Sequence, residues 1–427
     1  MEFFNKVNFT LIFLLVIVIK LILENYLSHR NILSIRKNTN NIPKRFKNII
    51  TQDEYSKGVG YNISKLKFQS LTSILSIILL LIITFGGLLN YLTIIASSLT
   101  NSNLVGSVIL GILFIVISEI YSIPLSLYST FKIEAKYGFN KTTIKIFILD
   151  SFKSLVLSIV IISIIFSLIV LIIENLNSLW WLYSFIAIFI FQIVLFFLYP
   201  TLIAPLFNKF EPLTDEEFKK PIEKLLSRVS FKSNGLFVMN ASLRSTHGNA
   251  FFTGFGKNKR IVFFDTLLKA ITPEEMESIL AHELGHAKLG HIRKGLVAST
   301  VISFISFYVL GIAFNSDNFF TGHGLDELTI FSKVLLFYIV SSYYIFFLTP
   351  ISSYFSRKRE FEADDFSLNY TDGKFMISGL IKLSKDNASN LTPDHLYSKY
   401  YYSHPPILER LKNLDQRILV VCSARYS

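Results

Sequence analysis

Long apolar runs dominate the pattern of hydrophobic and polar residues along this chain. Each run is close to the roughly 20 residues that an α-helix needs to cross the hydrocarbon core of a bilayer. Polar segments separate the runs, so each run predicts one membrane-spanning helix. We therefore expect seven spans, at Phe9–Leu27, Leu71–Ile95, Leu104–Leu127, Leu155–Ile173, Leu179–Leu202, Leu296–Phe314 and Phe331–Ile351.

The longest polar segment, 203–295, has a mixed pattern that is typical of a small α+β unit. Asp215–Val229 has helical periodicity, and three short runs have the composition of strands. The predicted strands are Gly235–Met239, Ala250–Phe255 and, after a turn at Gly256–Lys259, Arg260–Phe264. The expected fold class is a mainly α, polytopic membrane protein with this unit between spans five and six.

The chain then divides into four parts. Residues 1–202 hold five spans, 203–295 form the α+β unit, 296–351 hold spans six and seven, and 352–427 form a C-terminal segment.

Composition supports a membrane protein. Hydrophobic residues make up 51% of the 427 positions and 41 of them are Phe, which is too apolar for a soluble chain of this length. The net charge is +12, but the basic residues cluster in a few loops, which argues against a nucleic-acid partner. The single cysteine excludes an intrachain disulfide and a thiolate-rich metal site.

Loop charge predicts the orientation. Segments 28–70, 130–153 and 203–295 are basic, whereas 96–103, 174–178 and 315–330 contain no Lys or Arg. Because cytoplasmic loops carry the excess of Lys and Arg, we expect the N-terminus outside or in a lumen. The α+β unit and the C-terminal segment would then both lie in the cytosol.

The candidate chemistry lies on a helix that follows the strands. Thr272, Pro273 and Glu275 have the spacing of a helix cap, a first-turn proline and a capping box, and we expect the helix to continue through His291. The pattern HExxH at His282–His286 places two imidazoles one turn apart on one face, where both can bind one metal ion. The intervening Glu283 could take a proton from water at that metal. The alternative is a solvated helix with ordinary histidines.

A catalytic zinc site needs a third protein ligand. Glu360 and Asp364 lie one turn apart just after the seventh run, so Glu360 could bind the metal while Asp364 orients a ligand histidine. The alternative for this segment is a charged helix start beside the membrane. His291 is the nearest rival ligand, but on a continuous helix it points about 140° away from the other two histidines, so we predict a structural role for it.

Several motifs in order along the chain resemble the type I CAAX prenyl proteases, which are integral-membrane zinc endopeptidases. The matching segments are Glu134–Thr142, Ile203–Leu213, Arg244–Phe252, the HExxH helix, Glu360–Asp364 and Ser403–Pro406. The resemblance implies seven helices around a water-filled chamber and one Zn²⁺ per chain. It also implies removal of the last three residues from prenylated Cys-aliphatic-aliphatic-X (CAAX) proteins, in the endoplasmic reticulum membrane, with the nuclear envelope as an alternative location.

The same resemblance implies further site residues. Asn249 and Ala250 match a strand that binds the peptide backbone beside the metal, and an extended peptide can pair with a sheet edge in this way. His404 matches a residue that stabilises the oxyanion. Arg410 matches one that binds substrate, and both lie in the C-terminal segment.

Two other functions remain alternatives at this point. A membrane quality-control protease would share the HExxH and Glu-xxx-Asp patterns but have fewer spans. A zinc or solute transporter would use Lys20 and Glu119, which lie inside apolar runs, as pathway residues. The HExxH pattern precedes the sixth run instead of lying within a span, which favours a protease.

Overall fold

The protein is described by a computed structural model that covers residues 5–176, 178–253 and 259–426. Within these residues, seven helices are long and apolar enough to cross a membrane, which confirms the expected number of spans. Five belong to the N-terminal part: α1 (Lys6–Lys37), α2 (Gln52–Ile83), α4 (Asn103–Tyr128, continued through Tyr137), α6 (Ile144–Asn175) and α7 (Trp180–Leu198, continued through Phe207). The last two are α12 (His291–Ala313) and α14 (Ile330–Ile345), which continues into α15 (Thr349–Leu368).

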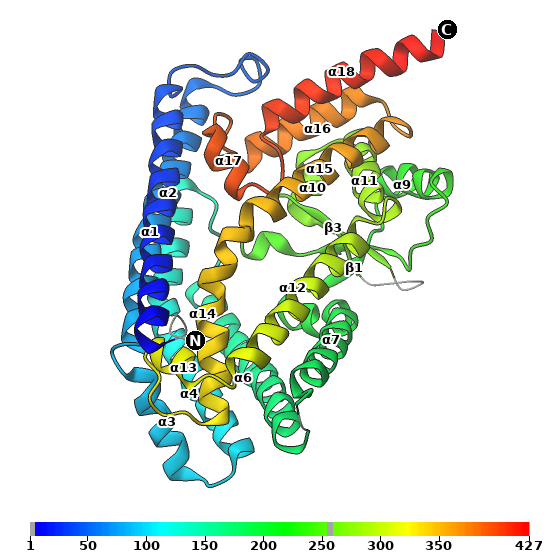
Figure 1. Ribbon diagram of the computed structural model, residues 1–427. Helices are drawn as coiled ribbons and strands as arrows, with labels where there is room; N and C mark the ends of the chain where they lie inside the picture. Colours follow the sequence, from blue (N-terminus) through cyan, green and yellow to red (C-terminus); the bar gives the residue numbers. More distant parts are fainter. Residues whose placement is uncertain (1–4, 177, 254–258, 427) are drawn as a thin grey trace.

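Several of these helices are longer than the apolar runs that predicted them. α1 and α2 each have 32 residues, about 48 Å at 1.5 Å per residue, and they stand side by side as a long pair (Figure 1). α4 packs along α6, and α7 packs against α12. A cluster of buried side chains, including Phe13, Leu110 and Leu335, joins the membrane helices.

The second predicted span is not one helix. α2 ends at Ile83, and a separate helix α3 (Leu88–Leu99) follows. The break lies at a pair of glycines: Gly87 has φ +74°, and a Cβ on Gly86 would lie 2.7 Å from the carbonyl oxygen of Ile82. Only glycine tolerates both conditions well, so the prediction of a continuous span to Ile95 was wrong.

The α+β unit lies at one end of the helical bundle, together with the C-terminal helices (Figure 1). Its four-stranded sheet has the order β1-β2-β4-β3, in which β2 and β4 are parallel and the outer pairs are antiparallel. The strands are β1 (Phe210–Pro212), β2 (Leu236–Met239), β3 (Ala250–Thr253) and β4 (Arg260–Phe264).

The predicted elements of this unit agree with the structure to within one or two residues where it is described. α9 (Glu216–Arg228) lies inside the expected helix, and its N-cap is Asp215. The end of the second predicted strand, Gly254–Phe255, and the turn residues 256–258 lie outside the described residues. The sequence did not predict β1, which has three residues and pairs with β2.

α11 (Pro273–Lys288) carries the HExxH pattern and packs against α9, α15 and α16. The remaining helices are α10 (Asp265–Ala270), α13 (Asp317–Gly322), α16 (Gly373–Asp386), α17 (His395–Tyr401) and α18 (Ile407–Tyr426). α11 does not continue through His291. Gly290, with φ +69°, ends it, and α12 starts at His291, because the left-handed conformation that glycine favours terminates a helix.

Candidate metal centre

The N-terminal cap of α11 sets the direction of the metal-binding helix. The Thr272 hydroxyl accepts a hydrogen bond from the Glu275 N–H, and the Glu275 carboxylate accepts one from the Thr272 N–H at 2.8 Å, with Pro273 in first position. This is the predicted capping box. The apolar face of the helix buries Met276, Leu280 and Leu284 in the core of the α+β unit, and the histidines lie on another face.

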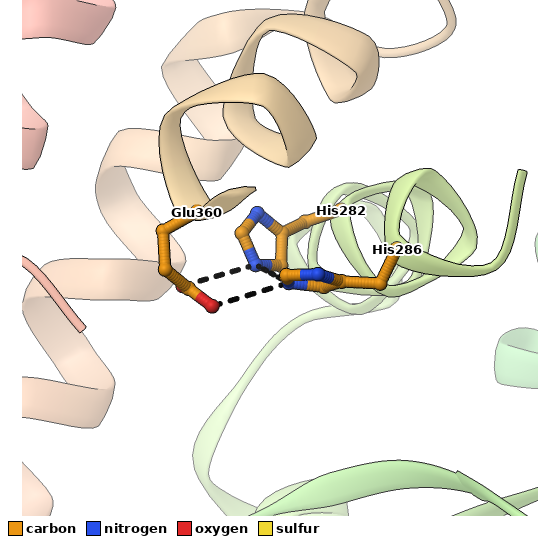
Figure 2. A group of neighbouring side chains, drawn as sticks. All are labelled: His282, His286 and Glu360. Atoms are coloured by element: carbon orange, nitrogen blue, oxygen red, sulfur yellow. Dashed lines mark hydrogen bonds and ion pairs between the residues drawn. The ribbon is translucent and has the colours of Figure 1, made fainter. Parts of the chain in front are cut away.

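Three predicted metal ligands lie together in the structure. His282 and His286 come from α11 and Glu360 from α15, and their side chains converge (Figure 2). The Nε2 atoms of His282 and His286 are 3.2 Å apart, and one Glu360 oxygen lies 3.2 Å from His286 Nε2. One ligand atom from each residue lies within 4.8 Å of the others.

A glycine lets the two helices approach closely enough for this geometry. Gly285 lies between the two histidines in sequence, and a Cβ there would be 3.1 Å from both Ala363 Cα and Phe366 Cβ of α15. Such contacts are tighter than normal packing allows. The small residue inside the HExxH pattern therefore lets α15 bring Glu360 to the histidines.

The donor set fits a divalent metal, and zinc in particular. Two imidazole nitrogens and one carboxylate form a common set for catalytic zinc. Glu360 is 3% exposed, and its Oε2 atom, though 2.8 Å from His404 Nδ1, accepts no hydrogen bond from the residues that the structure describes. A buried carboxylate oxygen without a hydrogen bond is costly, and a cation shared with the two Nε2 atoms would satisfy it.

Asp364 and Arg410 support the first histidine from behind. Asp364 Oδ1 lies 2.8 Å from His282 Nδ1. The Arg410 guanidinium donates to both oxygens of Asp364, at 3.0 and 2.6 Å, and is buried with it. Burial alone would lower the pKa of Arg410, but Asp364 and Glu360 raise it, so Arg410 stays charged.

The protonation of His282 depends on the same neighbours. Burial and Arg410 lower the pKa of His282, but its hydrogen bonds with Asp364 and Glu360 outweigh them and raise it to about 9. Without a metal, these carboxylates favour the ring that carries a proton on both nitrogens. A metal binds only a nitrogen without a proton, so metal binding at Nε2 would displace that proton.

Glu283 has the freedom that a general base requires. Its side chain is half-buried, and among the described residues its carboxylate makes no hydrogen bond or ion pair. Because it directly follows His282 on the helix, it lies beside the ligand cluster and not within it. The structure thus leaves this carboxylate available to accept a proton.

The structure brings His404 and Arg410 to the metal centre, but in different surroundings. His404 is largely exposed, and its Nδ1 lies 2.8 Å from Glu360 Oε2. Arg410 is buried behind His282, and the partners of its side chain are Asp364, Glu360 and His282. These contacts favour a role for Arg410 in holding the metal-ligand side chains in place. A direct role in binding substrate stays a prediction for Arg410.

Asn249 and Ala250 begin the edge strand of the sheet. β3 pairs with β4 on one side only, and α11 packs against it. Asn249 is exposed, and its side-chain oxygen accepts from the Ala250 N–H at 2.9 Å. An unpaired strand edge next to the metal helix is a geometry that can bind an extended peptide.

Three residues that the sequence analysis did not assign to the site also touch it. Asn387 holds the segment before β3, because its amide donates to the Gly248 carbonyl oxygen and accepts from the Gly248 N–H. Asn387, His404 and Arg410 line one cleft of about 510 Å³.

The other two residues are His291 and Glu362. His291 Nδ1 lies 2.9 Å from His286 Nδ1, and Glu362 contacts His291. The signal in the sequence that could have revealed the contact between His291 and His286 is Gly290, because a glycine at this position indicates that His291 is not on a continuous helix with His286.

Comparisons with known proteins agree with this description. Residues 31–209 match the family described as "CAAX prenyl protease N-terminal, five membrane helices", and residues 212–418 match peptidase family M48. A CAAX prenyl protease 1 homolog of Arabidopsis thaliana is 35% identical over 93% of this chain and 95% of its own length. CAAX prenyl protease 1 of Saccharomyces cerevisiae is 32% identical and covers 92% of each chain.

The fold is also similar to a solved structure. The crystal structure of S. mikatae Ste24p is 32% identical in sequence, with a TM-score of 0.87, over 96% of this chain and all of that chain. The likeness covers the membrane helices and the metal-bearing part together.

Proposed function

Because this chain belongs to the CAAX prenyl proteases of peptidase family M48 and is a multi-span membrane metalloprotease, we propose that it removes the last three residues from prenylated CAAX proteins. The substrates would carry a farnesyl or geranylgeranyl group on the cysteine. The observation that carries this proposal is the convergence of His282, His286 and Glu360 beside an open strand edge, in a chain with seven candidate spans.

His282, His286 and Glu360 would hold one Zn²⁺. When bound, zinc supplies a Lewis acid that lowers the pKa of water and polarises a peptide carbonyl. The remaining roles, which are orientation of the ligands and proton transfer, belong to residues of the chain. Asp364 fixes the ring of His282 through Nδ1, so that its other nitrogen faces the metal.

Glu283 would take a proton from the attacking water and pass it to the leaving nitrogen. One water is consumed in the reaction: its oxygen would bond to the carbonyl carbon as the bond from that carbon to the nitrogen breaks. The prenylated cysteine then ends in a carboxylate and the released tripeptide carries a free amine. His404 is exposed, and its Nδ1 faces Glu360. When the ring carries a proton on both nitrogens, its Nε2 would donate a hydrogen bond to the oxygen on which negative charge develops.

The substrate backbone would add to the edge of β3, beginning at Asn249 and Ala250. That strand has one partner in the described sheet, so its other edge offers hydrogen-bonding groups to an extended peptide. The prenyl group would lie among the membrane helices or in the bilayer, since each buried CH₂ contributes about 0.8 kcal/mol to partitioning. The expected chamber between the helices would then hold peptide and prenyl group together.

The proposed location is the endoplasmic reticulum membrane, with the metal centre and C-terminal segment on the cytosolic side. The charge of the loops supports this orientation, because 28–70, 130–153 and 203–295 are basic and the loops on the other side lack Lys and Arg. CAAX proteins are made in the cytosol, so a metal centre on that side can reach them.

The experiment measures release of the C-terminal tripeptide from a farnesylated CAAX peptide and from the same peptide without the prenyl group. The purified full chain is used with zinc, after chelation, and as Glu283→Gln. We expect cleavage of the farnesylated peptide alone, by the zinc-loaded wild type alone. Equal cleavage of both peptides would mean a quality-control protease instead, and no cleavage of either would refute the proposal.

A further inference from the structure

The two metal-binding histidines have different partners behind their rings. His282 Nδ1 lies against the carboxylate of Asp364 at 2.8 Å. His286 Nδ1 lies against another imidazole, that of His291, at 2.9 Å. His291 Nε2 in turn lies 3.0 Å from Glu362 Oε2. One ligand is therefore backed by a carboxylate directly and the other by a carboxylate through a second histidine.

The hydrogen-bond roles in this chain of residues follow from the metal-facing nitrogen. His286 Nε2 faces His282 and Glu360, so it must present a lone pair to bind a metal. A neutral imidazole carries one N–H, which His286 must then carry on Nδ1 and donate to His291 Nδ1. His291 carries its own N–H on Nε2, which donates to the carboxylate of Glu362. One assignment of tautomers therefore leaves a lone pair on His286 Nε2 and also satisfies the contact of His286 with His291 and that of His291 with Glu362.

The fold has built this arrangement. His291 is 4% exposed although it begins a membrane helix. Gly290, with φ +69°, ends α11 and directs the start of α12 so that the His291 ring meets the His286 ring at 5.0 Å between centroids. Glu362 comes from α15, the helix that also carries Glu360 and Asp364. A buried histidine with both nitrogens engaged is a specific construction and not a solvated loop residue.

We propose that His291 and Glu362 are positioning residues that hold His286 in the tautomer and orientation needed for metal binding. This inference rests on the proposed metalloprotease function and deepens it. Groups behind a ligand histidine fix its ring and raise its basicity, and their loss typically weakens metal binding by about 10- to 100-fold. His291 itself is no ligand, because neither nitrogen is left for a metal.

The test uses metal retention, which does not depend on turnover. The full chain is loaded with Zn²⁺ and then mixed with excess chelator, and the rate of zinc loss is followed with a chromogenic indicator. We expect His291→Leu to lose zinc about 10- to 100-fold faster than the wild type. His291→Asn, whose side-chain oxygen can occupy the position of Nδ1, should restore much of the retention.

A second variant and a spectrum separate positioning from folding. Glu362 is partly exposed, so Glu362→Gln should fold even if His291→Leu does not, and we expect it to release zinc several-fold faster. Glu274→Gln, an exposed carboxylate on α11, is the matched control and should behave as the wild type. The Co²⁺-substituted protein should show altered d–d absorption in His291→Leu and Glu362→Gln only.

The outcomes are distinct. The inference would be overturned if Glu362→Gln and folded His291→Leu lost zinc at the rate of the wild type and had an unchanged cobalt spectrum, whatever their activity. If the wild type holds zinc, and the variants release it faster, while no CAAX peptide is cleaved, the positioning role stands and the proposed substrate fails. A wild type that binds no zinc refutes both.

Discussion

The two helices that meet at Gly290 differ in how many of their residues are buried. α11 buries nine of its 16 residues, and these include Glu275, Ser278 and His282. α12 is largely apolar but buries four of its 23 residues, and Val297, Val301 and Ile305 are more than half exposed. The more polar helix is the buried one.

The difference follows from the solvent that each helix meets. Lipid tails are as apolar as Leu, so exposed hydrophobic side chains on a spanning helix lose nothing by not being buried in protein. On α11, the two buried titratable groups have partners: Lys382 for Glu275 and Asp364 for His282. Exposure of an apolar residue is therefore unremarkable on α12, whereas burial of a charge on α11 marks structure or function. Four substitutions would break or sharpen this comparison.

The largest expected effect is at Glu283, the acidic residue of the HExxH pattern, whose carboxylate has no hydrogen-bond or ion-pair partner in the described part of the chain. Glu283→Gln keeps the shape but cannot take a proton, so tripeptide release should fall by about 10²- to 10⁴-fold, the usual contribution of general acid–base catalysis. Zinc content, measured by atomic absorption, should stay at one per chain. An active Glu283→Gln, or one that has lost its metal, would contradict the role of general base.

A large loss of stability is expected from Arg410→Met. This change leaves Asp364 and Glu360 buried without their cation, and breaking a buried pair from one side typically costs about 3–5 kcal/mol. The metal-free protein is unfolded with denaturant in detergent micelles. Arg417 is the matched control, because it comes from the same helix and pairs with Asp365 at 3.0 Å but is half exposed. Arg417→Met should cost less than about 1 kcal/mol, and equal costs would refute the comparison.

A smaller loss of stability, which depends on pH, is expected from substitution of Glu275. Burial raises the pKa of this carboxyl, but its hydrogen bonds with Lys382, Ser378 and the Thr272 N–H lower it below the ordinary value of 4.5. A depressed pKa stabilises the folded state above the unfolded value, and this contribution is lost as the pH falls below about 4.5. Glu275→Gln should cost about 1–3 kcal/mol at neutral pH.

The stability of Glu275→Gln should also depend less on pH than the stability of the wild type does. Thermal midpoints measured from pH 7 down to pH 3 should converge for Glu275→Gln and the wild type at the acid end. Exposed Glu274→Gln is the control and should follow the wild type throughout. A constant difference between Glu275→Gln and the wild type over the whole range would mean that the carboxylate charge contributes nothing.

The smallest effect is expected on α12. Leu296→Ala, at a side chain that is 43% exposed, should change the free energy of unfolding by less than about 1 kcal/mol, because an exposed apolar side chain on a spanning helix would meet lipid tails that are as apolar as Leu. Leu284→Ala on α11, where the leucine is fully buried, should cost about 2–5 kcal/mol. Both are measured in the same lipid-detergent mixture. Similar costs would show that the apolar face of α12 is packed against protein.

Much of the local structure could be predicted because it depends on neighbouring residues. The seven spans, the cap at Thr272 and the helix over 216–228 follow from periodicity and from residues within a few positions. The errors arose where backbone conformation interrupts a pattern. Gly87 divides the second apolar run, and Gly290 divides the helix expected to reach His291, and apolar periodicity does not register either turn.

By itself, the sequence determined the number of membrane helices and the pairing of His282 with His286, since the 3.6-residue period of one helix sets the second without any fold. Tertiary structure alone decided which distant groups meet them. Glu360 reaches the histidines because Gly285 lets α15 approach, Arg410 is buried against Asp364, and His291 turns back to His286. The first two contacts join residues far apart in the chain, and the third joins two helices across the turn at Gly290, so all three depend on how helices pack and not on the preference of any one helix.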